Sequence, residues 1–181
     1  WNANTAPDPR ELRRPTDRLK YPRKNKASPP RAPAALTPML ATLVDRAPTD
    51  EEGWAWEIKY DGYRMLCRVG DGEVRFLSRN GNDWTDRLAA LSTRIAKSPL
   101  MKRGSGWLDG DVVVFKSDGG SDFQALQVAL DGASATPVFV VFDALQWDGE
   151  DFLGAPYVER VTMPDRGGCR LGASGALGRP R

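Results

Sequence analysis

Residues 57–64 (EIKYDGYR) place a lysine two residues before an Asp-Gly pair and five before an arginine. Large apolar side chains alternate with small or charged ones over residues 54–60, a pattern that predicts a strand with one buried face. Asp61-Gly62 then predicts a tight turn, and residues 63–69 predict the second strand of a hairpin. We therefore expect Lys59 near a turn on the polar face, either as an ordinary surface group or as a reactive amine.

The pattern after this hairpin predicts an α+β domain built on antiparallel strands. A third strand at 73–79 continues the hairpin into a meander over residues 54–79. Buried strands are predicted at 107–115 and 137–143, followed by a loop at 145–156. Two helices are also predicted, one capped by Asp83 and ending before Pro99, the other opened by a capping box of Ser121 and Gln124.

A net charge of +2 conceals a strong segregation of charge along the 181 residues. Residues 1–34 carry nine Lys/Arg and three Asp/Glu. Residues 35–164 carry 13 Lys/Arg and 20 Asp/Glu, and residues 165–181 carry four Arg and one Asp. The first segment is rich in proline and poor in apolar clusters, so we expect a flexible linker before an acidic domain. Its charge suits either contact with phosphate backbones or a spacer without a partner. The last segment is a Gly/Arg-rich tail without a core pattern.

Several classes of site are excluded by what the sequence lacks. It contains no histidine, and Cys67 and Cys169 lie far apart, which argues against Cys/His zinc sites and Ser-His or Cys-His catalysis. Neither GxGxxG nor GxxxxGK[ST] occurs, so side chains rather than a glycine-rich loop would have to hold a nucleotide. No apolar run is long enough to cross a bilayer, and no secretory leader is visible.

Four short stretches follow one another in an order that points to a family. They are residues 57–64 (EIKYDGYR), 78–81 (SRNG), 108–113 (LDGDVV) and 141–145 (VFDAL). This succession closely resembles the covalent nucleotidyltransferases, within them the ATP-dependent DNA ligases, and most nearly the ligase domain of bacterial DNA ligase D. The resemblance to DNA ligase D is strengthened by three further segments, TPMLA at 37–41, SRNGNDWT at 78–85 and FQALQ at 123–127. The resemblance covers about residues 36–160 and implies the ATP-grasp-like, antiparallel-sheet adenylation domain of these enzymes.

The resemblance implies a reaction at Lys59. Its amine would attack the α-phosphate of ATP, expel pyrophosphate and become a lysyl-adenylate. AMP would then pass to a DNA 5′-phosphate, and a 3′-hydroxyl would close the nick. The amine must first lose its proton, which partial desolvation, Mg²⁺ (or Mn²⁺) at the phosphates and the neighbouring Arg64 would favour.

Motif position also implies a set of nucleotide-binding residues. They are Glu57, Ile58, Arg64, Arg79, Asp111 and Phe142. The two arginines would contact ribose and phosphate or the DNA 5′-phosphate, the aromatic ring would stack on adenine, and Glu57 would line the base pocket. Asp111 stands where the family usually has glutamate and would contact the ribose or the metal ion. Structural alternatives remain open: a solvated strand end for Arg79, a turn for Asp111 and the core for Phe142.

The C-terminal residues depart from the family. The Glu-Gly motif, the lysine motif and the OB-fold that follow in DNA ligases are not found in residues 161–181. We expect an incomplete adenylation domain at 35–164 with weak self-adenylation, and a tail that arose by truncation or frameshift. The composition of the first residues likewise suggests a separate upstream domain.

The implied setting is DNA repair by non-homologous end joining and DNA recombination. We expect a monomer acting on nicked or broken double-stranded DNA, alongside end-joining proteins, in the bacterial cytoplasm at the nucleoid and away from membranes. Two other functions stay open. One is an RNA ligase or capping guanylyltransferase, which shares the lysine motif; the other is a non-catalytic remnant that binds nucleic acid through the basic segment.

Overall fold

The computed structural model describes residues 36–46, 49, 57–99, 104–132, 135–160 and 176–177. The predicted linker at 1–34, the start of the predicted strand at 54–60 and most of the tail lie outside these residues. In the part that is described, no helix has the length and apolar character needed to cross a membrane.

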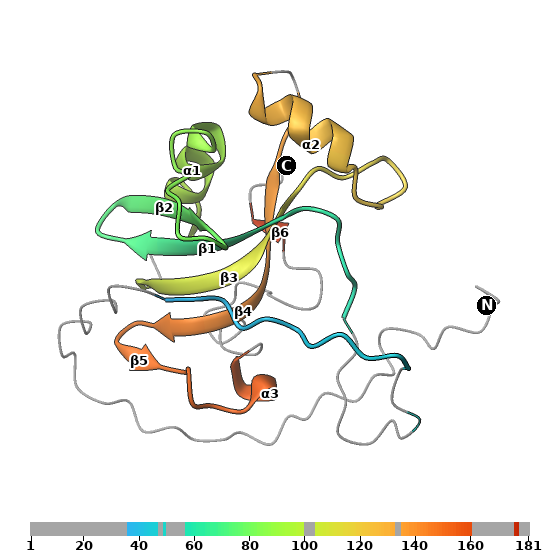
Figure 1. Ribbon diagram of the computed structural model, residues 1–181. Helices are drawn as coiled ribbons and strands as arrows, with labels where there is room; N and C mark the ends of the chain where they lie inside the picture. Colours follow the sequence, from blue (N-terminus) through green and yellow to red (C-terminus); the bar gives the residue numbers. More distant parts are fainter. Residues whose placement is uncertain are drawn as a thin grey trace, which may run out of the picture.

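The described residues form one antiparallel sheet (Figure 1). Its strands are β1 (Tyr63–Gly70), β2 (Glu73–Ser78), β3 (Gly106–Val113), β4 (Val138–Trp147), β5 (Glu150–Asp151) and β6 (Ala176–Leu177). The order across the sheet is β2-β1-β3-β4-β5, with β6 also paired to β4. Every pairing is antiparallel, so the predicted α+β class with an antiparallel sheet is confirmed.

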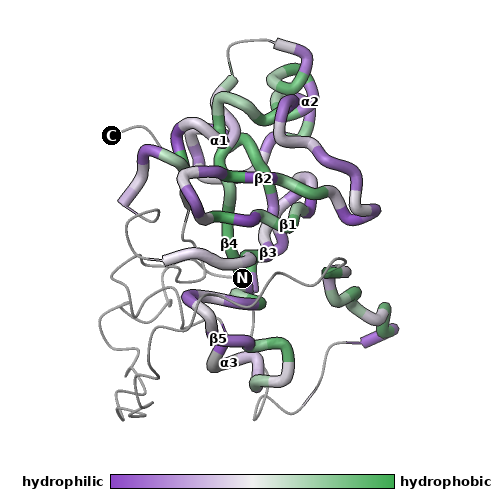
Figure 2. The backbone as a smooth tube through the Cα atoms, turned by 90° about the vertical axis from the view of Figure 1, so that its left-hand side faces the viewer, coloured by the Kyte–Doolittle hydropathy of each residue, from purple (hydrophilic) through white to green (hydrophobic). Residues whose placement is uncertain are grey.

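One face of the sheet packs against α1 (Ala89–Ala96) and α2 (Phe123–Leu130). Alternate side chains of the strands, among them Met65 and Phe76, meet Leu91 of α1 and Leu126 of α2 in the main buried core. In Figures 1 and 2 the sheet lies between these two helices and α3 (Tyr157–Arg160). The green colour of β4 in Figure 2 reflects the apolar run that predicted a buried strand.

The opposite face of the sheet is apolar at its two ends and polar between them. One small buried cluster consists of Leu66, Trp107 and Leu145. The other consists of Val113, Val138 and Val140. Between them β1 and β3 present Arg64, Asp109 and Asp111, because these residues alternate with the core positions of their strands. We call this row the polar strip.

Two Asp-Gly pairs behave differently in the sheet. Asp71 and Gly72 both have positive φ, 55° and 79°, as the predicted tight turn between β1 and β2 requires. Gly110 instead lies inside β3, where an added Cβ would come within 2.3 Å of the Val140 carbonyl oxygen. The close packing of two strands needs a glycine at this position. Asp111 follows it within β3, so the turn alternative for Asp111 is wrong.

The N-terminus of α1 differs from the prediction. The helix begins at Ala89, and its N-cap residue Leu88 makes no capping hydrogen bond. Asp83 does not cap it, because its carboxylate accepts hydrogen bonds from Arg75 (2.6 Å) and from the Thr85 N–H (2.9 Å). The bond from Arg75 ties the chain back to β2 before the helix starts.

The cap of α2 is displaced by one residue. Asp122, not Ser121, accepts the hydrogen bond from the Ala125 N–H, so the predicted capping box is wrong. The Ser121 hydroxyl accepts from the Asp61 N–H instead (2.9 Å). The predicted loop at 145–156 is also wrong in part, because β4 continues into it as far as Trp147 and β5 follows.

The strand predicted at 54–60 is not formed by its described residues, 57–60. Both edges of β1 are occupied, one by β2 and the other by β3, so no position is left for a hairpin partner before Tyr63. Ile58, expected on the buried face, is 62% exposed. Residues 57–62, which carry Lys59, thus lead into β1 without forming a strand, and we call them the approach segment.

Candidate active site

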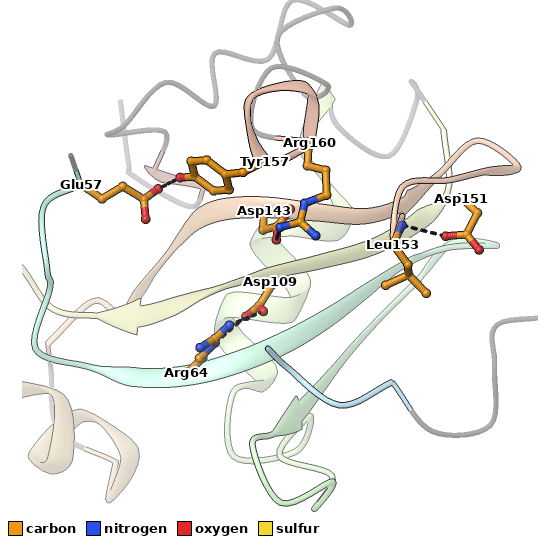
Figure 3. Close-up of polar contacts among 8 residues, drawn as sticks. All are labelled: Glu57, Arg64, Asp109, Asp143, Asp151, Leu153, Tyr157 and Arg160. Carbon is orange, nitrogen blue, oxygen red and sulfur yellow. Dashed lines mark hydrogen bonds and ion pairs between the residues drawn. The ribbon is translucent and has the colours of Figure 1, made fainter. Parts of the chain in front are cut away.

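Arg64 and Asp109 form the centre of the polar strip. The guanidinium donates two hydrogen bonds to the carboxylate, from Nε (3.0 Å) and Nη2 (2.8 Å), as Figure 3 shows. Asp109 is only 1% exposed, and burial raises its pKa while the bonds from Arg64 act in the opposite direction. The same bonds raise the pKa of Arg64. A fixed positive charge therefore stands at the sheet surface.

Lys59 shares its surroundings with Asp111. Asp111 lies directly across from Arg64 in the pairing of β1 with β3. Burial raises the pKa of Asp111, the charges of Arg64 and Lys59 lower it, and those of Asp109 and Glu57 raise it. The charges of four residues from two strands and the approach segment therefore act on Asp111.

The approach segment is held on both sides of Lys59. Tyr60 packs edge to face on Phe115, with ring centroids 5.4 Å apart. The Asp61 N–H donates to Ser121 at the start of α2. The lysine itself is exposed, so its amine is accessible while its backbone is anchored.

Phe142 stands at a β-bulge on the face of the sheet that carries the polar strip. Asp109 pairs with Asp143 and Gly110 with Val141, so Phe142 has no partner on β3. Phe142 lies on the face away from the helices because it continues the alternation of Val138 and Val140, and the bulge turns the next residue, Asp143, to the same face. Phe142 belongs to none of the buried clusters, and the Arg64 guanidinium lies 5.2 Å from its ring centroid. The core alternative for Phe142 is therefore wrong.

The other predicted site residues lie around this strip. Arg79 directly follows β2, whose last residue Ser78 pairs with Met65, so Arg79 emerges at the same end of the sheet as Arg64. Its side chain is exposed. Glu57 and Ile58 are exposed residues of the approach segment.

Two contacts from α3 were missed from the sequence. Arg160 Nη2 lies 3.2 Å from Asp143 Oδ2, and both side chains are 8% exposed. The Tyr157 hydroxyl donates a hydrogen bond to the Glu57 carboxylate, so α3 contacts both β4 and the approach segment (Figure 3). The sequence did contain one signal for the first contact, because an aspartate within the apolar run of β4 needs a partner when it is buried.

The carboxylates of the polar strip offer limited means to bind a metal ion. Among the residues described, no group of three or more His, Cys, Asp or Glu side chains could hold one. Asp109 is engaged by Arg64, which leaves Asp111 as the other carboxylate of the polar strip, and the charge of Lys59 acts on it. One carboxylate together with substrate phosphates and water is an ordinary environment for Mg²⁺. The residues therefore fit Mg²⁺ that is bound jointly with a triphosphate.

Asp143 gives the fold a pH dependence. Burial raises its pKa to about 6, with Asp109 acting in the same direction and Arg160 and Arg64 opposing. The unfolded value is about 3.9, so the folded state binds more protons between these values. This carboxyl group therefore lowers the free energy of unfolding as pH rises from about 4 to about 6, by at most about 3 kcal/mol.

Urea titrations of the wild type and of Asp143→Asn at several pH values measure this contribution. The variant keeps the shape of the side chain but does not titrate. Its stability relative to the wild type should increase between pH 4 and pH 7. A difference that stays constant with pH, or changes in the opposite direction, would contradict the assigned pKa.

Comparison with known proteins assigns the chain to a family. Residues 38–163 match the family described as ATP dependent DNA ligase domain. The multifunctional non-homologous end joining protein LigD of Pseudomonas aeruginosa is 43% identical over 129 residues, which are 71% of this chain and 15% of that protein. DNA ligase C of Mycobacterium tuberculosis is 32% identical over 134 residues, 69% of this chain and 36% of that protein.

The fold gives the same assignment. The crystal structure of the ligase domain from M. tuberculosis LigD superposes with a TM-score of 0.53 and 33% sequence identity, covering 60% of this chain and 34% of that one. The chain thus spans only part of the length of these relatives. The family match covers most of the chain and includes every described strand of the sheet except β6. The chain therefore belongs to the ATP-dependent DNA ligase domain family.

Proposed function

We propose that this chain supplies the nucleophile and part of the nucleotide pocket of an ATP-dependent DNA ligase. The observation that carries the proposal is the position of Lys59, an accessible amine on an anchored segment beside Arg64 and Asp111. The family assignment supports it, because enzymes of this kind act on DNA at the expense of ATP.

In the proposed first step Lys59 acts as the nucleophile. Its Nζ loses a proton and forms a bond to the α-phosphorus of ATP, while the bond from that phosphorus to the bridging oxygen breaks and pyrophosphate leaves. Arg64 is fixed by two hydrogen bonds and provides positive charge where negative charge develops. Mg²⁺ (or Mn²⁺), bound with Asp111, would neutralise charge on the phosphates.

The remaining residues would bind and orient the nucleotide. Phe142, on the face of the sheet away from α1 and α2, offers an aromatic surface to the base. Glu57 and Ile58 border the base from the approach segment. Arg79, at the end of β2, would contact the nucleotide phosphates or the 5′-phosphate of DNA.

The later steps would act on nicked or broken double-stranded DNA. The 5′-phosphate oxygen attacks the phosphorus of the lysyl-adenylate and releases the lysine; the 3′-hydroxyl then attacks the 5′-phosphate and releases AMP. The relatives named for non-homologous end joining support a role in DNA repair. We further propose a monomer that works with end-joining proteins at the nucleoid in the bacterial cytoplasm.

Incubation with ATP labelled at either the α- or the γ-phosphate tests the first step. With Mg²⁺ present, the α-label should stay on the protein in a denaturing gel and the γ-label should not, because pyrophosphate leaves. Addition of unlabelled nicked DNA should then remove the α-label. Retention of neither label by folded protein would overturn the proposal, and transfer from GTP in place of ATP would favour a guanylyltransferase.

A further inference from the structure

Tyr157 connects two segments that are far apart in the sequence. Its hydroxyl donates a hydrogen bond to Glu57, 100 residues earlier and two residues before Lys59. The ring of Tyr157 points from α3 toward the approach segment in Figure 3. Burial and the Glu57 carboxylate raise the pKa of Tyr157, so the phenol keeps its proton and remains a donor.

α3 is itself fixed on the sheet. Arg160 forms a nearly buried ion pair with Asp143, which directly follows the bulged Phe142 in β4. The Arg160 N–H also donates to the Pro156 carbonyl (3.3 Å), which closes the short helix. The helix therefore links the strand that carries Phe142 to the segment that carries Glu57.

We propose that Tyr157 is a positioning residue that sets the base specificity of the nucleotide pocket by holding Glu57 as a hydrogen-bond acceptor. The inference rests on the proposed function, because it requires a nucleotide base beside Glu57. It adds a residue of α3, a helix that the sequence pattern did not predict, to the parts that select the nucleotide.

The selection follows from the chemistry of a carboxylate. An ionised carboxylate can only accept hydrogen bonds. Oε1 of Glu57 is engaged by Tyr157, which leaves Oε2 to face the base in a fixed orientation. A purine with an amino group at position 6 can donate to this oxygen, whereas guanine presents a carbonyl there and leaves two acceptors facing each other. Without the phenol, exposed Glu57 can turn into water and the discrimination weakens.

Equilibrium binding of two analogues measures this selectivity without the covalent step. The probes are the α,β-methylene analogues of ATP and GTP, in which the bond that Lys59 would break is replaced by a P–C bond. Tyr157→Phe should weaken binding of the ATP analogue about tenfold and leave the GTP analogue nearly unchanged. Tyr63→Phe is the matched control, because that ring packs between Trp84 and Phe123 in the core and should keep the wild-type ratio.

A second variant separates a positioning role from a structural one. Glu57→Gln should lower the preference for the ATP analogue over the GTP analogue, since an amide can also donate a hydrogen bond. In the Glu57→Gln background, Tyr157→Phe should cause no further change in this preference. If Tyr157→Phe leaves the ratio of the two analogues' affinities unchanged, including the case in which both weaken equally, the inference is overturned and the proposed function is not. Failure of the wild type to bind either analogue would overturn the proposed function with it.

Discussion

Replacement of Lys59 by alanine is expected to reduce the α-labelled protein adduct by more than about a thousandfold, because no other group replaces a missing covalent nucleophile. The side chain is exposed, so its removal should leave the unfolding midpoint in urea nearly unchanged. The loss of label would therefore report chemistry and not unfolding. The measurement is a denaturing gel of protein incubated with α-labelled ATP and Mg²⁺.

Lys97→Ala is the control for this experiment. Lys97 is also exposed, but it lies at the C-terminal end of α1, on the helix that covers the other face of the sheet. This variant should keep the adduct. An adduct of equal intensity in Lys59→Ala would contradict the assignment of the nucleophile.

Replacement of Arg64 by methionine is expected to lower the free energy of unfolding by about 3 kcal/mol. The change removes two hydrogen bonds from Asp109 and leaves a carboxylate that is 1% exposed without its hydrogen-bonded counter-charge. It also removes positive charge from beside Lys59, so any adduct should fall further than the loss of stability explains. Urea unfolding followed by tryptophan fluorescence measures the first effect.

The double variant Arg64→Met, Asp109→Leu tests the physical reason for this loss. Replacing both members of a buried pair by apolar residues is often close to neutral, so most of the stability should return. The adduct should not return, because the positive charge is still absent. A single Arg64→Met change that costs less than about 1 kcal/mol would show that Asp109 does not depend on Arg64.

The hairpin of β1 and β2 and the buried strand β4 could be predicted because their signals are local. Asp71-Gly72 supplies the backbone conformation of the turn, and alternation supplies the faces. The start of α1 was missed because Asp83, a good cap by residue type, is bound by Arg75 from another strand. Side-chain competition of this kind depends on the tertiary structure and is not visible in a local pattern.

The same distinction holds for the site. Motif spacing named Lys59, Arg64 and Asp111 as candidates, and the structure pairs Arg64 with Asp111. Asp109 and Asp143 are missed as buried partners, since each is paired with an arginine that is distant in the sequence. The bulge that turns Asp143 to the same face as Phe142 depends on the register between β3 and β4, which sequence alternation does not encode. These contacts decide which motif residues meet.

The most direct measurement of the central claim is the location of AMP on the protein. The wild-type chain is incubated with ATP and Mg²⁺, digested with a protease and analysed by tandem mass spectrometry. The account predicts AMP on the side chain of Lys59, in a peptide that contains the sequence EIKYDGYR. AMP on a different residue, or no modified peptide from folded protein, would contradict the claim that Lys59 is the nucleophile of a ligase site.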